Sequence, residues 1–443
     1  MIPHAIERPD RIPKQRYVDP DFYALEADYL WPRVWQMACR LEQIPNVGDS
    51  VEYEILDQSV IVTRSSPTEV RAFQNACRHR GVKLVEDCAS CPSGFTCPFH
   101  GWSYGLDGAN TFVSRPRTFA ESNLRPDDIS LVDVRCETWG GCAWINLDRN
   151  APSLRDSIEP GATTLDAWMV EDMHAEWWRS FHLPVNWKLA QEAFMEQYHV
   201  LETHPQLRIP GRVAPKNPKA FDPKHFIESE LVYLHEMSDG MAGMVHAHDV
   251  AVAERLAPTA VLPQEAGGAR AEWERIMNDA VVEWHTEQGH PIPDLNDIEA
   301  RGLTEPMVYV FPHWFVLPMY SSASSYRFRP LGPEDTLMEI WSLTRFPEGD
   351  RKPLPRPEVW AHDDERVPPI PTQDFSNLPR QQRGLHTQGF EYMRLSEGIE
   401  GHIGNFHRTI DAYLSGTPLE SILPALRELN LNPLERPVVD LGL

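Results

Sequence analysis

Hydrophobic and polar positions along the chain predict a helical start followed by a strand-rich region. Between about 21 and 45 the apolar residues recur at helix-like spacing, as Phe22, Leu25, Tyr29, Leu30 and Val34. Alternating or β-branched runs then predict strands at Val51–Ile55, Val60–Thr63, Val70–Phe73 and Cys142–Leu147. Gly- and Cys-rich loops at 77–110 separate the third of these strands from the fourth.

A second region begins near 155 and contains a long polar interruption. Residues 184–202 predict a helix with several polar side chains, and 210–300 form a mostly polar insertion with a helical patch at Ala271–Thr286. Strands return at Met307–Leu317, Ser324–Arg329 and Leu337–Thr344. The end is helical, with a natural stop at Gly416 and an apolar face of Leu395, Ile399, Ile403, Phe406, Ile410 and Tyr413.

These patterns divide the chain into three parts. We expect a helical N-terminal segment at 1–40, a β-rich domain with the cysteine loops at 41–150, and a larger domain at 151–443 that carries the insertion at about 210–300. A chain of 443 residues is long enough for two or three such hydrophobic cores.

Composition narrows the class of partner. Forty-one basic and 65 acidic residues leave a net charge of −24, which argues against nucleic acid and against an anionic membrane surface as partners. The first 20 residues are polar and rich in proline, without the apolar core of a signal peptide, and no apolar stretch reaches membrane-spanning length. We therefore expect a cytoplasmic protein.

Four of the seven cysteines crowd between positions 77 and 97, which favours a metal site over a disulfide framework. Cys77-Arg-His79 and Cys97-Pro-Phe-His100 each offer one thiolate and one imidazole. Such a set suits a [2Fe–2S] cluster with both thiolates on one iron and both imidazoles on the other. A zinc ribbon, or core cysteines beside surface histidines, are the alternatives. We expect Cys88 and Cys91 to lie in a loop between the two ligand hairpins.

A second group of ligands lies at the end of the predicted helix 184–202. His199 and His204 are five residues apart, so they would not face one ion on a regular helix. Pro205 disfavours helical backbone at His204, which therefore lies at the helix end and can turn back toward His199. Two histidines and one distant carboxylate form the facial triad of non-haem Fe(II) sites. Glu196 shares a helical face with His199 and can bond its free ring nitrogen.

Together these segments resemble the Rieske non-haem iron aromatic-ring-hydroxylating oxygenases, in their α (catalytic) subunits. Cys77-Arg-His-Arg-Gly81 and Cys97–His100 are similar to the first family motif, and Asn186-Trp-Lys188 with Glu196–His204 to the second. The likeness runs from about 20 to 416. It implies an α+β protein, with a β-rich Rieske domain followed by a helix-grip (START-like) catalytic domain built on an antiparallel sheet.

The resemblance also implies cofactors, partners and a reaction. Cys77, His79, Cys97 and His100 would hold the [2Fe–2S] cluster, and His199, His204 and a late carboxylate the mononuclear Fe(II). Asp374 matches that carboxylate best, ahead of Asp363 and Asp364. A homotrimer, with or without a small β subunit, would link His100 of one copy through Glu196 to His199 of its neighbour. NAD(P)H would supply electrons through a flavin reductase and/or ferredoxin for hydroxylation of a small organic substrate by O₂.

Some features leave the reaction and the smaller sites open. Glu196 stands where the family usually has aspartate, as in relatives acting on quaternary amines, so oxidative N- or O-demethylation is the alternative to ring hydroxylation. We expect His246-Ala-His248, at strand spacing in the insertion, to bind no metal. Arg78, Arg80 and Lys83 are either a ferredoxin docking surface or solvated charges. A pure Rieske electron carrier and a START-like binding module with structural zinc are the rival functions.

Overall fold

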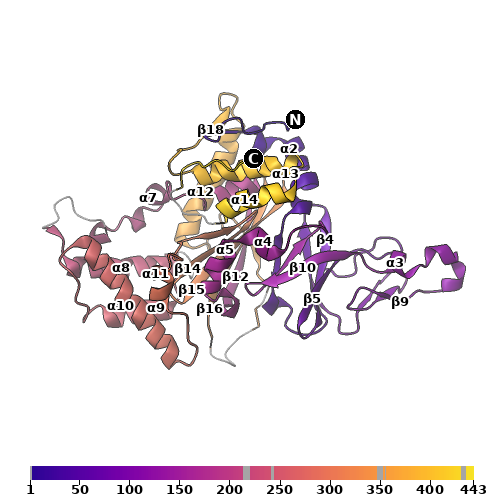
Figure 1. Ribbon diagram of the computed structural model, residues 1–443, viewed down its shortest axis with the longest axis horizontal. Coiled ribbons are helices and arrows are strands. Elements are labelled where there is room, and N and C mark those ends of the chain that lie inside the picture. The colour runs from indigo at the N-terminus through magenta and orange to yellow at the C-terminus, as the bar shows by residue number, and fades with distance from the viewer. Residues whose placement is uncertain (1, 213–219, 241–243, 347–352, 355, 431–435) are drawn as a thin grey trace.

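Two mainly antiparallel sheets organise the chain, the first built from strands between residues 36 and 146 and the second from strands between residues 174 and 361 (Figure 1). The computed structural model describes residues 2–212, 220–240, 244–346, 353–354, 356–430 and 436–443. Helices and antiparallel strands are combined in one chain, so the predicted α+β class is confirmed.

The first sheet has seven strands and shows the alternation expected from the sequence. Val51, Tyr53 and Ile55 point into its core, since side chains of a strand alternate between faces. In spatial order its strands are β2 (Gln36–Arg40), β11 (Cys142–Asn146), β10 (Asp133–Trp139), β5 (Glu69–Gln74), β4 (Gln58–Ser66), β3 (Asp49–Ile55) and β6 (Cys88–Ser90). The four strands predicted in this region are confirmed.

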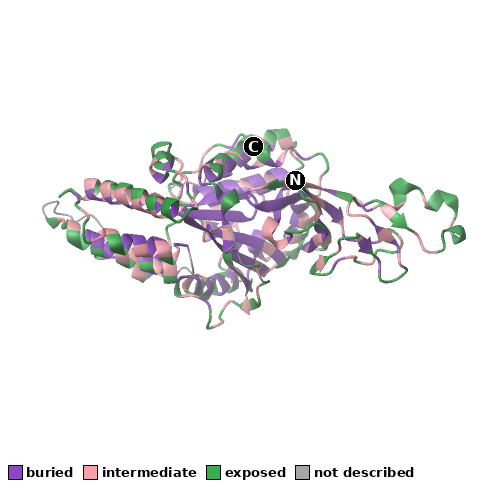
Figure 2. Cartoon of the chain, turned by 90° about the horizontal axis from the view of Figure 1, so that it is seen from below, coloured by how far each residue is buried: buried purple, intermediate pink, exposed green. Residues whose placement is uncertain are grey.

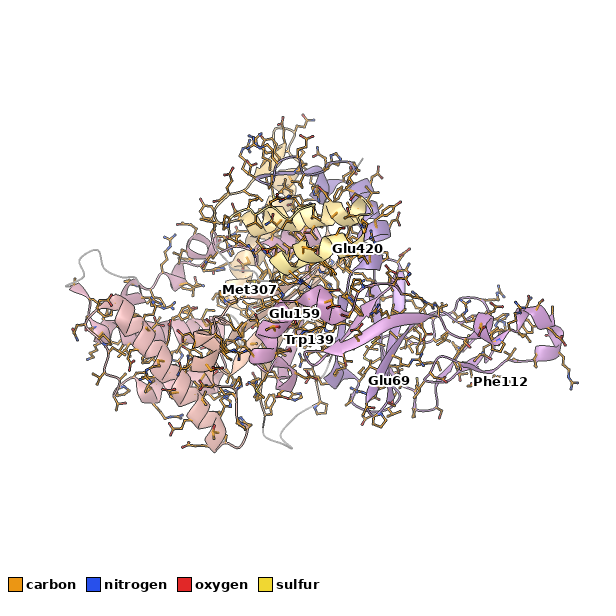
Figure 3. All side chains as sticks on the ribbon, in the orientation of Figure 1. Glu69, Phe112, Trp139, Glu159, Met307 and Glu420 are labelled. Atoms are coloured by element: carbon orange, nitrogen blue, oxygen red, sulfur yellow. The ribbon has the colours of Figure 1, made fainter. Side chains whose placement is uncertain are left out.

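A narrow extension leaves this sheet and carries the cysteine loops. Its three short strands are β7 (Phe95–Thr96), β8 (Ser103–Tyr104) and β9 (Asn110–Phe112), followed by two short 3₁₀ turns and α3 (Pro126–Ile129). Phe112 lies far out on this extension and is exposed (Figure 3). The extension therefore projects away from the rest of the chain (Figure 1).

The second sheet forms the centre of the larger domain. Its order is β13 (Val308–Val310), β14 (Trp314–Met319), β15 (Ser322–Gly332), β16 (Asp335–Thr344), β12 (His174–Leu183) and β17 (Val359–Ala361), and only the β12–β17 pair is parallel. The strand predicted at Met307–Leu317 is in fact two strands, because the chain turns between Val310 and Trp314. Figure 2 shows the strands of this sheet buried between helices.

C-terminal helices pack on this sheet, and an N-terminal helix packs against them. The N-terminal ones are α1 (Gln15–Val18) and α2 (Pro20–Leu25), and the connection between the sheets holds α4 (Leu154–Ile158) and α5 (Gly161–Ala167). The C-terminal ones are α12 (Pro369–Leu385), α13 (Gly401–Leu414) and α14 (Leu419–Leu429). Gly416 ends α13 with a φ of +74°, as predicted, since glycine adopts this left-handed conformation without strain. A short two-stranded sheet joins β1 (Arg11–Pro13) to β18 (Tyr392–Arg394).

The predicted insertion is a helical layer beside the end of the second sheet (Figure 1). It contains α8 (Pro223–His235), α9 (Ala247–Leu256), α10 (Ala266–Glu287) and α11 (Leu295–Ala300). The helical patch predicted at Ala271–Thr286 lies within α10. No helix among the described residues combines the length and the apolar character that crossing a membrane requires.

Two helix predictions are wrong in extent. The helical pattern of 21–45 ends at Arg33, and Gln36–Arg40 forms β2, whose five residues are all buried where the strand pairs with β11. The helix predicted at 184–202 is interrupted: α6 (Trp187–Glu192) ends before Ala193, and α7 (Val200–Thr203) begins after His199. That interruption matters for the ligands described below.

Candidate metal centres

The two Cys–His loops have the same backbone design. In each, the cysteine N–H donates to the carbonyl five residues on, at 2.8 Å (Cys77 to Val82, Cys97 to Trp102), and the following glycine N–H donates back to the cysteine carbonyl. Gly81 and Gly101 have φ of +76° and +73°, where a side chain would be strained. The sequence therefore builds two matching hairpin turns, each presenting one thiol and one imidazole.

The donors of these loops are arranged as a Rieske cluster requires. The Cys77 and Cys97 side chains are buried, whereas His100 is exposed and His79 half-buried. The two Nδ1 atoms of His79 and His100 lie 3.2 Å apart, close enough to bind one iron. Thiols inside and imidazoles outside fit a [2Fe–2S] cluster whose two irons differ in ligand type.

Aromatic side chains surround this site. His79 stacks on Trp102 with a ring distance of 5.1 Å, and Phe119 packs edge-on against both rings. Tyr104 places its hydroxyl 3.2 Å from Cys77 Sγ and accepts the Arg78 backbone N–H at 2.9 Å. Burial and the contact with Cys77 raise the pKa of Tyr104, so the hydroxyl keeps its proton and donates to the thiolate.

Removing this hydroxyl should lower the reduction potential of the cluster. A hydrogen bond to a ligand sulfur stabilises the more negative, reduced state. For Tyr104→Phe we expect a shift of roughly −40 mV, which corresponds to about 1 kcal/mol for a one-electron couple. Redox titration of the cluster absorbance measures the shift. Tyr29→Phe, at an exposed tyrosine on the N-terminal helix, is the control, and an unchanged potential in Tyr104→Phe would contradict the assigned donor.

The basic residues and the extra cysteine beside the Cys–His loops take part in contacts within the domain. Lys83 pairs with Glu52 at 2.7 Å and with Glu54 at 2.6 Å, so this charge is engaged within the domain. Arg78 donates to the Asp128 carbonyl. Cys88 lies in β6 and pairs with β3, so the expected loop between the hairpins contains a short strand.

The break between α6 and α7 sets the positions of the two later histidines. His199 is the residue before α7, and His204 ends α7 with φ −116° and ψ 70°, outside the helical region, as the following proline predicts. Their rings consequently face each other at a centroid distance of 5.6 Å and an angle of 73°. Two histidines that a regular helix would separate thus point toward one place.

Asp374 from α12 completes this group. Its Oδ1 lies 3.2 Å from His204 Nε2 and 3.7 Å from His199 Nε2. With metal–ligand bonds of about 2.1 Å, ligand atoms of one ion lie about 3 Å apart, so the three donors fit a single metal. The runners-up lie elsewhere: Asp364 is paired with Arg366 at 2.7 Å, and Asp363 is exposed.

Each histidine is oriented by a second partner on its other ring nitrogen. Glu196 Oε1 lies 2.6 Å from His199 Nδ1, and its Oε2 accepts the His199 backbone N–H. Gln373 Oε1 accepts from His204 Nδ1 at 2.7 Å and also from Gln206. Such contacts fix the tautomer that leaves Nε2 free for a metal. The sequence analysis missed the part of Gln373, although it adjoins Asp374.

The same carboxylates control the charge of the histidines. Burial by itself would lower the pKa of His199 and of His204. The hydrogen bonds and charges of Glu196 and Asp374 outweigh burial, so both pKa values are raised without a metal. A dication bound at the two Nε2 atoms would replace the protons that His199 and His204 otherwise hold there.

A cavity of about 240 Å³ opens beside His199 and Asp374. Its polar lining includes Glu192, Glu196 and Glu400, and its apolar lining includes Leu189, Leu378, Met393, Leu395 and Ile403. Glu192 is the least exposed of the three carboxylates, and the sequence analysis did not select it. The sequence could have indicated Glu192, because it lies four residues before Glu196 and residues at this spacing share one face of a helix.

Glu192 belongs to a buried polar network. It accepts a hydrogen bond from the Tyr17 hydroxyl at 2.9 Å, and His407 Nε2 lies 2.8 Å away. Arg16 donates to His407 Nδ1 at 3.0 Å, so the neutral imidazole carries its proton on Nε2 and donates it to Glu192. Burial raises the pKa of Glu192 to about 8, despite the opposing contact with Tyr17. Glu192 is therefore mostly protonated at neutral pH.

This proton should make stability depend on pH. The native state holds it up to about pH 8, whereas an unfolded glutamate loses it near pH 4.3. Its stabilisation is thus complete below the unfolded pKa and is lost as pH rises through 8, at up to about 1.4 kcal/mol per pH unit. We expect Glu192→Gln to flatten the fall in melting temperature between pH 5.5 and 8.5. Calorimetry with exposed Glu202→Gln as control tests this, and equal slopes in all three proteins would refute it.

Comparison with known proteins places the chain in a family. Residues 170–416 match the model of the ring hydroxylating alpha subunit (catalytic domain), and 34–120 match that of the Rieske [2Fe-2S] domain. The carnitine monooxygenase oxygenase subunit of Escherichia coli (strain K12) is 31% identical over 196 residues, which cover 44% of this chain and 52% of that protein. The anthranilate 1,2-dioxygenase large subunit of Acinetobacter baylyi is 32% identical over 200 residues, covering 44% and 42%.

The sequence match is partial, whereas the structural match is nearly complete. In these alignments the chain spans about half the length of the curated relatives it matches. A structure of naphthalene 1,2-dioxygenase bound to phenanthrene has the same fold, with a TM-score of 0.62 at 18% identity over 96% of this chain and 97% of that one. With a catalytic-domain match over more than half of its length, the chain belongs to the ring-hydroxylating α subunits and carries a Rieske [2Fe–2S] domain.

Proposed function

We propose that this protein is the terminal oxygenase component of a Rieske system and hydroxylates a small organic substrate with O₂. The convergence of His199, His204 and Asp374 carries the proposal, because this donor set leaves coordination positions open. When bound there, Fe(II) supplies the centre at which O₂ is activated. A pure electron carrier would have no use for this second group of ligands.

The chain's own residues have distinct parts in this proposal. His199, His204 and Asp374 hold the mononuclear ion, while Glu196 and Gln373 orient the two imidazoles. Cys77, Cys97, His79 and His100 hold the cluster, and Tyr104 tunes it. The apolar lining beside His199 excludes water from the reacting centre. Protonated Glu192 lines the same cavity and can donate its proton to a group bound there.

The positions of the two centres support an assembly of several copies. In one chain the cluster loops lie toward the extension and α7 lies on the opposite side of the molecule (Figure 1). Electrons therefore need a second copy, in which Glu196 meets the exposed His100 of its neighbour. A homotrimer, with or without a small β subunit, satisfies this contact, and a flavin reductase and/or ferredoxin would bring electrons from NAD(P)H. The mass of the assembly in solution measures the copy number.

An aromatic or similar organic compound is the proposed substrate, with mono- or cis-dihydroxylation as the reaction. A second candidate is oxidative N- or O-demethylation of a quaternary-amine or methoxy compound. One observation favours it: besides the ligand Asp374 and protonated Glu192, Glu196 and Glu400 line the cavity at His199, and negative charge attracts a cationic substrate. The relatives named carnitine and choline monooxygenases are consistent with this candidate.

A coupled assay tests the proposal. The purified chain, its metals and a surrogate reductase are supplied with NADH, O₂ and either aromatic or quaternary-ammonium compounds. Substrate-dependent O₂ uptake with a hydroxylated product supports ring oxidation, and release of formaldehyde supports the second candidate. A colourless protein with zinc and without acid-labile sulfide would instead identify a binding module.

A further inference from the structure

The helical insertion contains a second histidine–carboxylate cluster, remote in sequence from the proposed iron ligands. His248 and Asp249 begin α9, His285 lies near the end of α10, and Ser321 comes from the turn between β14 and β15. One ligand atom from each of His248, Asp249 and His285 lies within 4.8 Å of the others. Three segments, α9, α10 and the β14–β15 turn, therefore meet at one buried place.

The helices bring these side chains together by their apolar faces. The buried positions of α10 recur every four residues, as Ala269, Trp273, Met277, Val281 and then His285. A stripe that packs against the rest of the domain thus ends in an imidazole. In α9, Asp249 likewise lies among the buried Val250, Val252 and Ala253. Folding of the insertion itself assembles the cluster.

Distances within the cluster match those around a metal ion. His248 Nε2 lies 3.2 Å from His285 Nε2 and 3.4 Å from Asp249 Oδ1, and His285 Nε2 lies 3.9 Å from the same oxygen. Ligand atoms of tetrahedral zinc are about 3.3 Å apart for bonds of 2.0–2.1 Å. The Ser321 hydroxyl, 2.8 Å from His248 Nε2 and 2.9 Å from Asp249 Oδ1, is a fourth oxygen at the same place.

Charge provides a second, independent reason. The Asp249 and His285 side chains are 0% exposed, and within the described ranges the ion pairs of Asp249 involve only the two imidazoles. The neighbouring Arg345 donates instead to the backbone carbonyls of Ser321 and Trp168. A buried carboxylate without a permanent cation is costly. A dication held by neutral imidazoles would compensate it.

The outer contacts are those of a metal site as well. His285 Nδ1 lies 2.8 Å from His290 Nδ1, which fixes the ring with Nε2 toward the cluster. Ser321 and Ser322 donate to the Asp249 carboxylate. The Asp249 and His285 side chains are fully buried and 14% of the His248 side chain is exposed. His248, Asp249, His285 and Ser321 would fill the four positions of a tetrahedral ion, and sites without an open position are structural rather than catalytic.

We propose that His248, Asp249 and His285 bind a structural transition-metal dication, with Zn²⁺ the best match, that ties α9 and α10 to the β14–β15 turn. This inference stands independently of the oxygenase assignment. It departs from the expectation that His246-Ala-His248 binds no metal, and the structure places His248 in helix α9, not in a strand. His246 precedes α9 and faces Glu176, whereas His248 points into the cluster.

Zinc analysis of matched variants tests the site. The holoprotein and its His285→Gln and His246→Gln variants are loaded with ZnCl₂, freed of loose metal and measured for zinc and iron per chain. We expect His285→Gln to lose about one zinc per chain and His246→Gln to lose none, with iron unchanged in both. Any zinc that binds at the mononuclear site is the same in all three proteins, so it does not affect the difference in zinc content between them. Equal zinc in all three proteins would overturn the proposal.

Anomalous diffraction provides a decision that does not depend on variant folding. Wild-type crystals loaded with ZnCl₂ are measured on both sides of the zinc absorption edge. A peak between the His248, Asp249 and His285 side chains supports the site, and its absence at full zinc load contradicts it. A failed oxygenase assay would leave this peak unaffected, so the two proposals fail separately.

Discussion

His204→Ala is expected to lose the mononuclear iron and to keep the [2Fe–2S] cluster. His204 is one of three donors on the ion and is itself held by Gln373. Loss of an outer contact alone weakens metal binding by about 10–100-fold, so loss of a ligand weakens it further. We expect iron to fall by about one atom per chain and substrate oxidation to fall below detection. Iron analysis together with the visible spectrum of the cluster measures both.

The control for this prediction is His235→Ala, at an exposed histidine on α8 that pairs only with Glu254 among the described residues. It should retain the full iron content and activity. Iron retained at full stoichiometry in His204→Ala would show that the three residues are not the ligand set. A simultaneous loss of cluster absorbance would point to general misfolding, and His204→Gln, which retains side-chain volume, then replaces it.

Glu196→Gln is expected to keep both metals and to slow electron delivery to the iron. The charge of Glu196 fixes His199 at 2.6 Å, and in the proposed trimer it also meets His100 of the neighbouring copy. An amide of similar shape keeps the packing but loses the charge that holds both imidazoles. We expect coupled turnover to fall by about 10–100-fold. Stopped-flow oxidation of the reduced cluster, with O₂ and substrate, measures the step directly.

Glu202→Gln is the matched control, since this side chain is 84% exposed and lies three residues after His199. It should oxidise its cluster at the wild-type rate. A wild-type rate in Glu196→Gln would refute the bridging part of Glu196 while leaving the ligand set intact. Loss of iron in that variant would instead show that Glu196 acts mainly by orienting His199.

The two motif regions show how far local sequence carries. Cys77, His79, Cys97 and His100 lie in short loops whose glycines adopt the positive φ that each tight turn needs, so their spacing predicts their chemistry. His204 is similar, because Pro205 acts on its immediate neighbour. The strands at 49–55 and 58–66 were also predictable, the first from alternation at Val51–Ile55 and the second from the β-branched run Val60–Thr63.

Other elements were not predictable from neighbours alone. Gln36–Arg40 follows a helical pattern but is a buried strand, because pairing with β11 outweighs local preference. The β12 strand went unpredicted, since Glu176, Arg179 and His182 interrupt its apolar residues. Whether Asp374 lies in a helix or a charged loop depends on the packing of α12 against the rest of the domain.

By itself the sequence determined the protein's class, the cluster loops and the helix-end histidines, because each of these depends on residues within a few positions of one another. Only the tertiary structure decided that Asp374 meets His199 and His204, that Glu192 is buried with Tyr17 and His407, and that His248, Asp249 and His285 share one site. Those groups join segments far apart in the chain, and long-range packing, not spacing, sets which distant side chains become neighbours.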